Sequence, residues 1–248
     1  MMILLRATAT AMLVMMALCL ARAPAQAEQG GPPANMICER HINEAERALD
    51  IPSQLLQAIG LVESGVWNEA RGRSIAWPWT VYAQKHGRRF ANKAEAVAEV
   101  RRLYNQGVRN IDIGCMQVNL HYHGQAFDSL EGVFDPAHNV AYAALLLKSL
   151  YRDARSWSTA IARYHSWTPK LARLYRNKVK SAWGTARRAA YEDRRLAEED
   201  GRRRCGASAK PSDALRRVAG ATGTAACQGF RTASRAASDV PHRYAARS

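Results

Sequence analysis

The chain has 248 residues, a formal net charge of +15 and a sequence pI near 10.1. Its length fits one compact domain with flanking segments, and its positive charge favours an anionic partner. Nucleic acid is the usual candidate for a basic chain. However, the sequence shows no nucleic-acid-binding motif and its beginning predicts export, so we expect no nucleic-acid partner.

Residues 1–27 are predicted to form a secretory signal peptide. Arg6 precedes an apolar run over residues 7–20, and Ala25-Gln26-Ala27 has the small-x-small pattern of a cleavage site. The apolar run is shorter than the about 20 residues that a membrane span needs, although an uncleaved anchor is the alternative. We therefore expect a periplasmic protein, monomeric in solution, with no transmembrane segment in the mature chain.

Four cysteines would remain after cleavage: Cys38, Cys115, Cys205 and Cys227. An even number in an exported chain allows two disulfides, in three possible pairings. We favour Cys38–Cys115 and Cys205–Cys227, because each bridge then stays within one region. The cysteine spacings do not predict a zinc or redox site, and His121-Tyr122-His123 has no evident third ligand. We therefore expect no metal and no other cofactor.

Composition divides the mature chain into three regions. Residues 28–36 are a polar lead, and residues 37–184 hold nearly all the aromatic residues and the apolar periods of a folded domain. Residues 185–248 are rich in Ala, Arg, Ser and Gly. Because such a segment buries too little apolar area to offset its ordering entropy, we predict a basic, largely disordered tail, with a helix around residues 185–200.

The domain is predicted to begin with two helices. Ile42, Ala45 and Leu49 share one face of the first. The second starts near Pro52 and ends at Gly65, where we expect a left-handed cap. Its apolar period comprises Leu55, Leu56, Ile59 and Val62.

Residues 77–90 have no helical period and are predicted to form a small hairpin or loop. Asn92 and Glu95 make a capping box before a helix that ends at Gly107. A helix over residues 135–151 is apolar on most sides and is predicted to be the buried central helix.

Two more helices are predicted to follow, one ending at Tyr164 and one after Pro169. The last is expected to continue the apolar face through Leu171, Leu174 and Ala182. The predicted fold class is therefore mainly α, with at most a small β-hairpin.

Glu63 is the candidate catalytic residue. It follows Ile59 by 4 residues and Leu55 by 8, which places it on the apolar face of its helix and in the last turn. Burial and the negative end of the helix dipole both raise the pKa of a carboxyl group there. A carboxyl that is protonated near neutral pH is what a general acid needs. The alternative is a structural glutamate whose tip reaches solvent.

Residues 114–119, Gly-Cys-Met-Gln-Val-Asn, are a candidate ligand-binding loop. Gly114 permits a close approach of the backbone to a ligand. Gln117 and Asn119 offer donors and acceptors that match the N-acetyl and hydroxyl groups of amino sugars. The alternative is a tight turn in which these polar side chains hold the backbone.

Aromatic residues extend the candidate site. Trp77 and Trp79, in the stretch Trp-Pro-Trp-Thr, offer flat faces suited to sugar rings. Tyr164 and His165 end a later helix. For the two tryptophans and for Tyr164, core packing is the alternative.

The order of Glu63-Ser64, the loop at residues 114–119 and the pair Tyr164-His165 resembles the catalytic domain of soluble lytic transglycosylases, lysozyme-like enzymes that cut peptidoglycan. The resemblance covers about residues 37–183, and a Trp-Pro-Trp-Thr stretch occurs in a proteobacterial subset. His165 stands where the family commonly has asparagine, and Cys115 where leucine is usual. The resemblance implies a lysozyme-like fold and peptidoglycan glycan strands as substrate.

The resemblance also implies a mechanism. Glu63 would protonate the oxygen between N-acetylmuramic acid and N-acetylglucosamine, then take the proton of the muramic 6-hydroxyl as a 1,6-anhydro ring closes. Ser64 would orient the substrate or Glu63, and Tyr164 would position Glu63 by a hydrogen bond. Gln117 and the Met116 backbone would hold the acetamido group.

Two other functions stay open. A hydrolytic muramidase on the same fold needs a second carboxylate, and Asp112 is the nearest candidate in motif terms. A non-catalytic wall-binding assembly factor of a secretion or flagellar system is the other. The paired arginines of residues 185–248 suit a targeting or docking segment for such an envelope complex, with a solvated tail of no function as the alternative.

Overall fold

The computed structural model describes residues 34–207. The predicted signal peptide, most of the polar lead and residues 208–248, with Cys227, lie outside the described residues. The helices in chain order are α2 (Ala34–Ala48), α3 (Leu55–Ser64), α4 (Lys93–Asn105), α5 (Leu120–His123), α6 (Leu130–Val133), α7 (Pro136–Ala154), α8 (Trp157–His165) and α9 (Pro169–Ala207), with short 3-10 turns η1 (Glu69–Arg71) and η2 (Gly124–Ala126). The strands are β1 (Gly65–Asn68), β2 (Arg73–Ala76), β3 (Thr80–Ala83), β4 (His86–Arg89), β5 (Ile111–Ile113) and β6 (Val118–Asn119).

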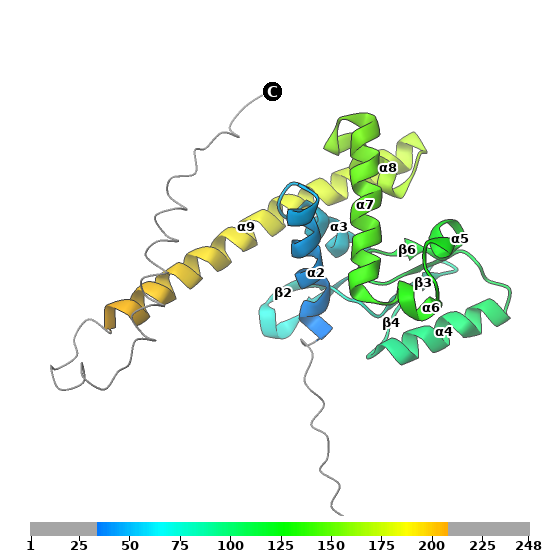
Figure 1. Cartoon of the computed structure of the whole chain (residues 1–248), viewed down its shortest axis with the longest axis horizontal. Coiled ribbons are helices and arrows are strands. Elements are labelled where there is room, and N and C mark those ends of the chain that lie inside the picture. The colour runs from blue at the N-terminus through cyan, green and yellow to red at the C-terminus, as the bar shows by residue number, and fades with distance from the viewer. Residues whose placement is uncertain (1–33, 208–248) are drawn as a thin grey trace, which may run out of the picture.

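Helix α7 stands at the centre of the fold, with α2 and α8 packed against it (Figure 1). Asp135 caps its first turn by accepting a hydrogen bond from the Ala137 N–H at 2.9 Å, and Pro136 is its first residue. Val140 and Leu147 are fully buried. The prediction of a buried central helix is confirmed.

Helix α3 begins at Leu55, three residues later than Pro52 suggested. Its free N–H groups are satisfied by one buried side chain, Glu46 of α2. The carboxylate accepts hydrogen bonds from the backbone N–H groups of Gln54 at 2.7 Å, Leu56 at 2.7 Å and Gln57 at 3.1 Å. An acidic side chain at this positive end of the helix also complements the dipole.

The end of α3 differs from the predicted left-handed cap. Gly65 has φ −54° and ψ 134°, because the chain turns directly into strand β1. A glycine is still required here, since a Cβ atom would lie 2.2 Å from the carbonyl oxygen of Leu61. This abrupt change from helix to strand places Glu63 at the junction of two elements.

Two small antiparallel sheets flank the helices. β1 pairs with β2, and a second sheet has the order β4-β3-β5-β6. The hairpin β3–β4 confirms the structure predicted for residues 77–90, and β5 and β6 add strands that the sequence did not predict. In β5, Ile111 and Ile113 are fully buried, and Asp112, which alternates with them, is partly exposed.

Helix α4 begins as predicted. The Asn92 side chain accepts a hydrogen bond from the Glu95 N–H at 2.9 Å, and Glu95 accepts one from the Ala91 N–H at 3.2 Å. The Asn92 side chain thus satisfies one free N–H of the first turn, and Glu95 reaches back to the N–H of the residue before the cap.

Helix α9 is 39 residues long, and its second half runs out past the domain (Figure 1). It buries Tyr175 and Val179, whereas Leu171 and Leu174 are 48% and 50% exposed, contrary to the prediction for this face. The proposed boundary between residues 184 and 185 falls inside this helix, where Ala186 is still buried.

Residues 185–207 are helical, which confirms the helix predicted around residues 185–200 and extends it to Ala207. Ion pairs at i,i+4 spacing support its exposed part. They are Arg195–Glu199, Arg202–Glu198, Arg203–Glu199 and Arg204–Asp200. Each such pair contributes about 0.3–0.5 kcal/mol to an exposed helix. Within residues 34–207, no helix is long and apolar enough to cross a membrane.

Candidate active site

Glu63 lies in the last turn of α3 and is partly buried. Burial raises the pKa of its carboxyl, the hydrogen bond from Tyr175 opposes the shift, and the charge of Asp112 adds to it, with a net pKa of about 7. A raised pKa is what the position of Glu63 on the apolar face of its helix predicts. A group with this pKa holds a proton in about half of the molecules at neutral pH, so it can give a proton and then accept one.

Tyr175 of α9 is the hydrogen-bond partner of this carboxyl group. Its hydroxyl donates to Glu63 Oε1 at 2.5 Å, and the residue is only 5% exposed. The ring stacks on His165, with centroids 4.6 Å apart and planes 8° apart. It also lies nearly parallel to Tyr164, at 6.4 Å and 16°. Two rings of α8 therefore pack against the tyrosine that contacts the candidate acid.

Tyr164 does not make the hydrogen bond to Glu63 that the sequence predicted. Its hydroxyl donates to the Met116 carbonyl oxygen at 3.0 Å, so Tyr164 ties α8 to the loop at residues 114–119. Tyr175 takes the predicted role. The helical spacing of Tyr175 and Val179 was the available signal, but Leu171 and Leu174 suggested a different buried face.

The loop at residues 114–119 is held by Asn139, a buried residue of α7 that the sequence did not mark. Its Oδ1 accepts a hydrogen bond from the Met116 N–H at 2.9 Å, and its Nδ2 donates to the Ile113 carbonyl at 3.0 Å. Gly114 has φ +84°, and a Cβ there would lie 2.4 Å from Asn139 Nδ2. The close approach that Gly114 permits is therefore to Asn139 instead of a ligand, and the Met116 N–H is already bonded.

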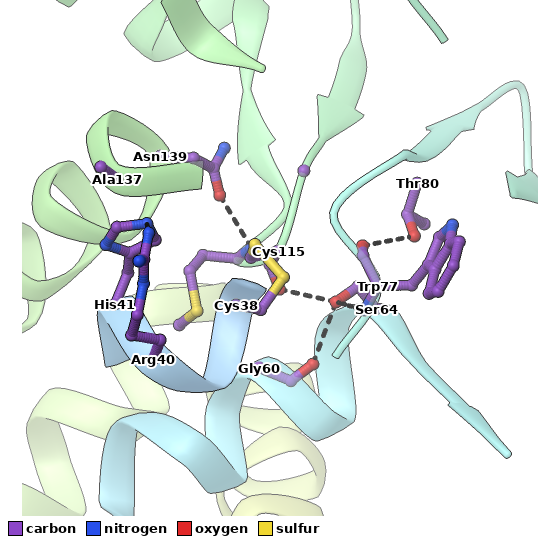
Figure 2. The surroundings of a disulfide bond; sticks show 12 residues. Cys38, Arg40, His41, Gly60, Ser64, Trp77, Thr80, Cys115, Ala137 and Asn139 are labelled. Carbon is purple, nitrogen blue, oxygen red and sulfur yellow. Dashed lines mark hydrogen bonds between the residues drawn. A yellow bond between two sulfur atoms is a disulfide. The ribbon is translucent and has the colours of Figure 1, made fainter. Parts of the chain in front are cut away.

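Ser64 also supports this loop, and its predicted role of orienting the substrate or Glu63 stays a prediction. Figure 2 shows its hydroxyl pointing at the Cys115 carbonyl oxygen, to which it donates at 2.7 Å. Ser64 is fully buried and accepts a hydrogen bond from the Trp77 N–H at 3.2 Å. It joins α3, the loop and the start of the β3–β4 hairpin.

The side-chain amides of Gln117 and Asn119 both make hydrogen bonds within the protein, but with different partners. Gln117 adopts φ 47°, and its Nε2 donates to the Gly114 carbonyl at 3.1 Å and to the Thr80 carbonyl at 3.3 Å. Asn119 donates to Asp112 Oδ1 at 2.7 Å and caps α5 through its Oδ1. The alternative of polar side chains that hold the backbone therefore describes both residues: the Gln117 Nε2 bonds two carbonyl groups, and the Asn119 Oδ1 caps α5.

The two tryptophans lie at the base of the β3–β4 hairpin and are partly buried. Trp77 Nε1 donates to the Phe90 carbonyl at 2.8 Å, so its indole N–H is used within the protein. Trp79 packs against the hydrophobic core. Both contacts match core packing, the alternative to a sugar-binding role.

Asp112 of β5 lies near Glu63, and His123 and His165 lie near Asp112. Burial raises the pKa of Asp112, and the hydrogen bond from Asn119 and the charges of His165 and His123 lower it. Burial lowers the pKa of both histidines, and the charge of Asp112 opposes this. His123 also shares a hydrogen bond of 2.8 Å with the Tyr142 hydroxyl.

No group of three or more His, Cys, Asp or Glu side chains is placed to hold a metal ion among the residues that the structure describes.

The predicted disulfide Cys38–Cys115 is present, with Cα atoms 5.8 Å apart and a sequence separation of 77. Both residues are buried. The bridge ties α2 to the loop that Ser64 and Asn139 also hold (Figure 2). Cys205 lies near the end of α9, and its predicted partner Cys227 is outside the described residues, so the second pairing stays a prediction.

These residues form a mainly helical domain around one carboxyl group with a raised pKa and a tyrosine partner. The family model of the transglycosylase SLT domain matches residues 40–182, more than half of the chain. The chain belongs to the transglycosylase SLT domain family, which confirms the predicted lysozyme-like fold class. The family supports a function of the peptidoglycan transglycosylase type. No curated protein and no solved structure matches the chain significantly.

Proposed function

We propose that this protein is a peptidoglycan lytic transglycosylase, and that Glu63 acts as both its acid and its base. The enzyme would cleave the β-1,4 bond between N-acetylmuramic acid and N-acetylglucosamine and leave a 1,6-anhydro-N-acetylmuramic end. The observation that carries the proposal is the pKa of about 7 for the Glu63 carboxyl, beside the hydroxyl of Tyr175. One group with this proton affinity serves both steps of the reaction.

In the first step, protonated Glu63 gives its proton to the bridging oxygen as the bond from that oxygen to the muramic C1 breaks. The neighbouring acetamido oxygen stabilises the positive charge on C1. Glu63 becomes a carboxylate, and the Tyr175 hydroxyl stabilises that charge because a hydrogen bond to an ionised acceptor is stronger than one to a neutral acceptor.

In the second step, the Glu63 carboxylate takes the proton of the muramic 6-hydroxyl, and the 6-oxygen bonds to C1. The 1,6-anhydro ring closes and Glu63 is protonated again. No water enters the product, so the reaction is an intramolecular transfer of the muramic C1 from the bridging oxygen to the 6-oxygen, instead of a hydrolysis.

Among the predicted substrate-binding residues, we propose Gln117 and His165 as direct contacts. No donor within residues 34–207 reaches the side-chain oxygen of Gln117, which leaves it for an acetamido N–H. His165 is exposed beside Tyr175. Ser64, Asn119 and Tyr164 would act through the shape of the loop that they hold.

Product mass spectrometry on purified peptidoglycan tests the proposal. Anhydro ends, lighter than reducing ends by one water, are the expected product. Reducing ends would show a hydrolase. Intact strands would show a wall-binding protein without activity, the assembly-factor alternative.

A hydrolytic muramidase is the second candidate, and Asp112 is the observation that favours it. Its charge is close enough to Glu63 to raise the pKa of that carboxyl. A second carboxylate near the acid is what both hydrolytic mechanisms require. However, one oxygen of Asp112 already accepts a hydrogen bond from Asn119, so the carboxylate is partly used within the protein.

We also propose that the protein acts in the periplasm, in wall remodelling or in local opening of the wall for a secretion or flagellar complex. The predicted signal peptide at residues 1–27 supports export, and the basic residues after α9 suit docking. Retention on isolated cell envelope should fall when the chain is truncated after Ala207, and the loss should be largest at low salt. Equal retention of the two forms would exclude a docking role for residues 208–248.

A further inference from the structure

Helices α8 and α9 carry a concentration of positive charge. Residues 154–191 contain nine Arg or Lys and no Asp or Glu. Within the part of the chain that the structure describes, the ion pairs of α9 begin only at Asp193. The cations of residues 154–191 therefore form no ion pair among residues 34–207, and this part of the surface favours an anionic partner.

Large apolar side chains are exposed among these cations. Trp167, in the turn between α8 and α9, is 71% exposed, and Leu171 and Leu174 are about half exposed. Lys170 and Lys178 are exposed as well. Leu174 follows Lys170 by four residues and Leu171 by three, and Lys178 follows it by four, so these side chains are neighbours on the helix surface. We call Trp167, Lys170, Leu171, Leu174 and Lys178 the α9 patch.

The exposed tryptophan of the patch is held in place. The guanidinium carbon of Arg163 lies 4.6 Å from the centroid of the Trp167 ring, which keeps a positive charge beside the ring. The Thr168 N–H donates to the Ser166 hydroxyl at 3.1 Å, and the Thr168 carbonyl accepts from the Ala172 N–H at 2.9 Å. The turn that presents Trp167 is therefore fixed to the first turn of α9.

Exposed leucines, an exposed tryptophan and lysines on one helix surface match an anionic lipid bilayer. Tryptophan favours the headgroup region, leucine side chains enter the acyl boundary, and Lys and Arg are attracted to anionic lipids. A glycan strand stacks on aromatic rings but gives no apolar surroundings to leucine side chains. Protein interfaces are depleted in lysine. The combination in the patch therefore favours a lipid surface over a glycan or an acidic protein.

We propose that the α9 patch docks on the surface of a bilayer that contains anionic phospholipids. The first half of α9 would lie along the surface, with the three apolar side chains of the patch in the interface. Its two lysines would extend to the lipid phosphates, as long cationic side chains do at such surfaces. Charge complementarity between this acid-free segment and the phosphates is the main attraction.

The patch adjoins the candidate active site. Tyr175 follows Leu174 directly in α9, donates its hydrogen bond to Glu63 and stacks on His165. Docking through the patch would therefore hold the candidate active site close to the membrane surface.

Sedimentation with lipid vesicles tests the proposal, using the chain from Glu28 as it would be after the predicted cleavage. The protein should bind vesicles of equal parts phosphatidylglycerol and phosphatidylcholine much more tightly than vesicles of phosphatidylcholine alone. Binding should weaken as salt screens the charges. Lys170→Glu/Lys178→Glu should lower the partition coefficient at least about 25-fold, because each cation near an anionic surface contributes a factor of about five.

Trp167→Ala removes the largest apolar side chain of the patch and should lower the partition coefficient about tenfold. Trp67→Ala is its matched control, because Trp67 is an exposed tryptophan of β1, outside the patch. Lys85→Glu/Lys93→Glu makes the same change of net charge as the double lysine variant, in the β3–β4 turn and at the start of α4. Both controls should bind the vesicles as the parent does.

No binding of the parent to the anionic vesicles, or equal binding to both kinds of vesicle, would overturn the proposal. Equal binding by patch and control variants would also overturn it and assign the contact to another basic segment, such as residues 208–248. So would a loss of retention on purified peptidoglycan in Lys170→Glu/Lys178→Glu without any loss on vesicles, because the patch would then bind the wall. Vesicle binding involves no glycan cleavage, so its outcome is independent of the proposed function.

Discussion

The Tyr175 hydroxyl donates a hydrogen bond to Glu63 Oε1 at 2.5 Å, across 112 residues of sequence. This contact fastens α9 to the last turn of α3 and fixes the direction of the candidate acid. Burial favours protonated Glu63, and the hydrogen bond favours its ionised form. Burial has the larger effect, so the pKa of Glu63 lies near 7 instead of near 4.5.

Tyr175→Phe should shift the pH profile of glycan cleavage. The general acid must be protonated, so activity falls as pH rises through the pKa of Glu63. Because the Tyr175 hydrogen bond lowers that pKa, its loss should move the falling limb to higher pH and reduce the maximal rate about tenfold or more. Tyr164→Phe is the matched control, and its falling limb should stay in place. An unchanged limb in Tyr175→Phe would show that the contact does not set the pKa.

Glu63→Gln should alter stability in a pH-dependent way. The folded-state pKa of Glu63 is raised from 4.5 to about 7, so its contribution to stability is fully present below about pH 4.5 and is lost as pH rises to 7. Glutamine cannot ionise. Relative to the wild type, the variant should therefore gain up to about 3 kcal/mol in free energy of unfolding between pH 4.5 and pH 8. Urea unfolding at the two pH values measures this gain, and a constant difference would contradict the raised pKa.

The variant Asp112→Asn distinguishes a transglycosylase from a hydrolase. For a transglycosylase, removal of this charge should lower the pKa of Glu63 and move the falling limb of activity to lower pH, with activity kept within about tenfold. For a hydrolase, the second carboxylate is essential, and activity should fall by about 10² or more. Asp128→Asn, at an exposed position, is the control for a change of charge alone.

Removal of the Cys38–Cys115 bridge should cost stability. A bridge that closes a loop of this length stabilises by about 4 kcal/mol in the chain-entropy model. The double variant Cys38→Ala/Cys115→Ala should lose a free energy of unfolding of this order, and a reductant should bring the wild type to the same level. Peptide mapping without reduction should recover the linked pair. Recovery of both residues as free thiols from oxidised protein would show that the bridge does not form.

Local sequence patterns were sufficient to predict most of the helices. The apolar period of residues 55–62 placed Glu63 on a buried face, and the capping box at Asn92 located the start of α4. The even cysteine count and the two chain regions led to the pair Cys38–Cys115. Each of these features depends on neighbouring residues or on a simple count. A single sequence is therefore enough to predict them.

The contacts that shape the site could not be predicted in the same way. Tyr175 lies on a helix in which Leu171 and Leu174 are about half exposed, because α3 and α8 cover the adjacent side of α9. Asn139 is a polar residue within the apolar pattern of α7, and two of its hydrogen bonds reach the distant backbone groups of Met116 and Ile113. Both depend on which helix faces meet, which the sequence pattern does not specify.

The central claim is that Glu63 is the acid and the base of a transglycosylase. The direct test is mass spectrometry of the soluble products after purified peptidoglycan is incubated with the wild type, with Glu63→Gln and with Glu69→Gln, an exposed control. We predict anhydro-ended fragments from the wild type and the control, and a loss of at least 10²–10⁴-fold in Glu63→Gln. Anhydro fragments from Glu63→Gln at the wild-type rate would contradict the account.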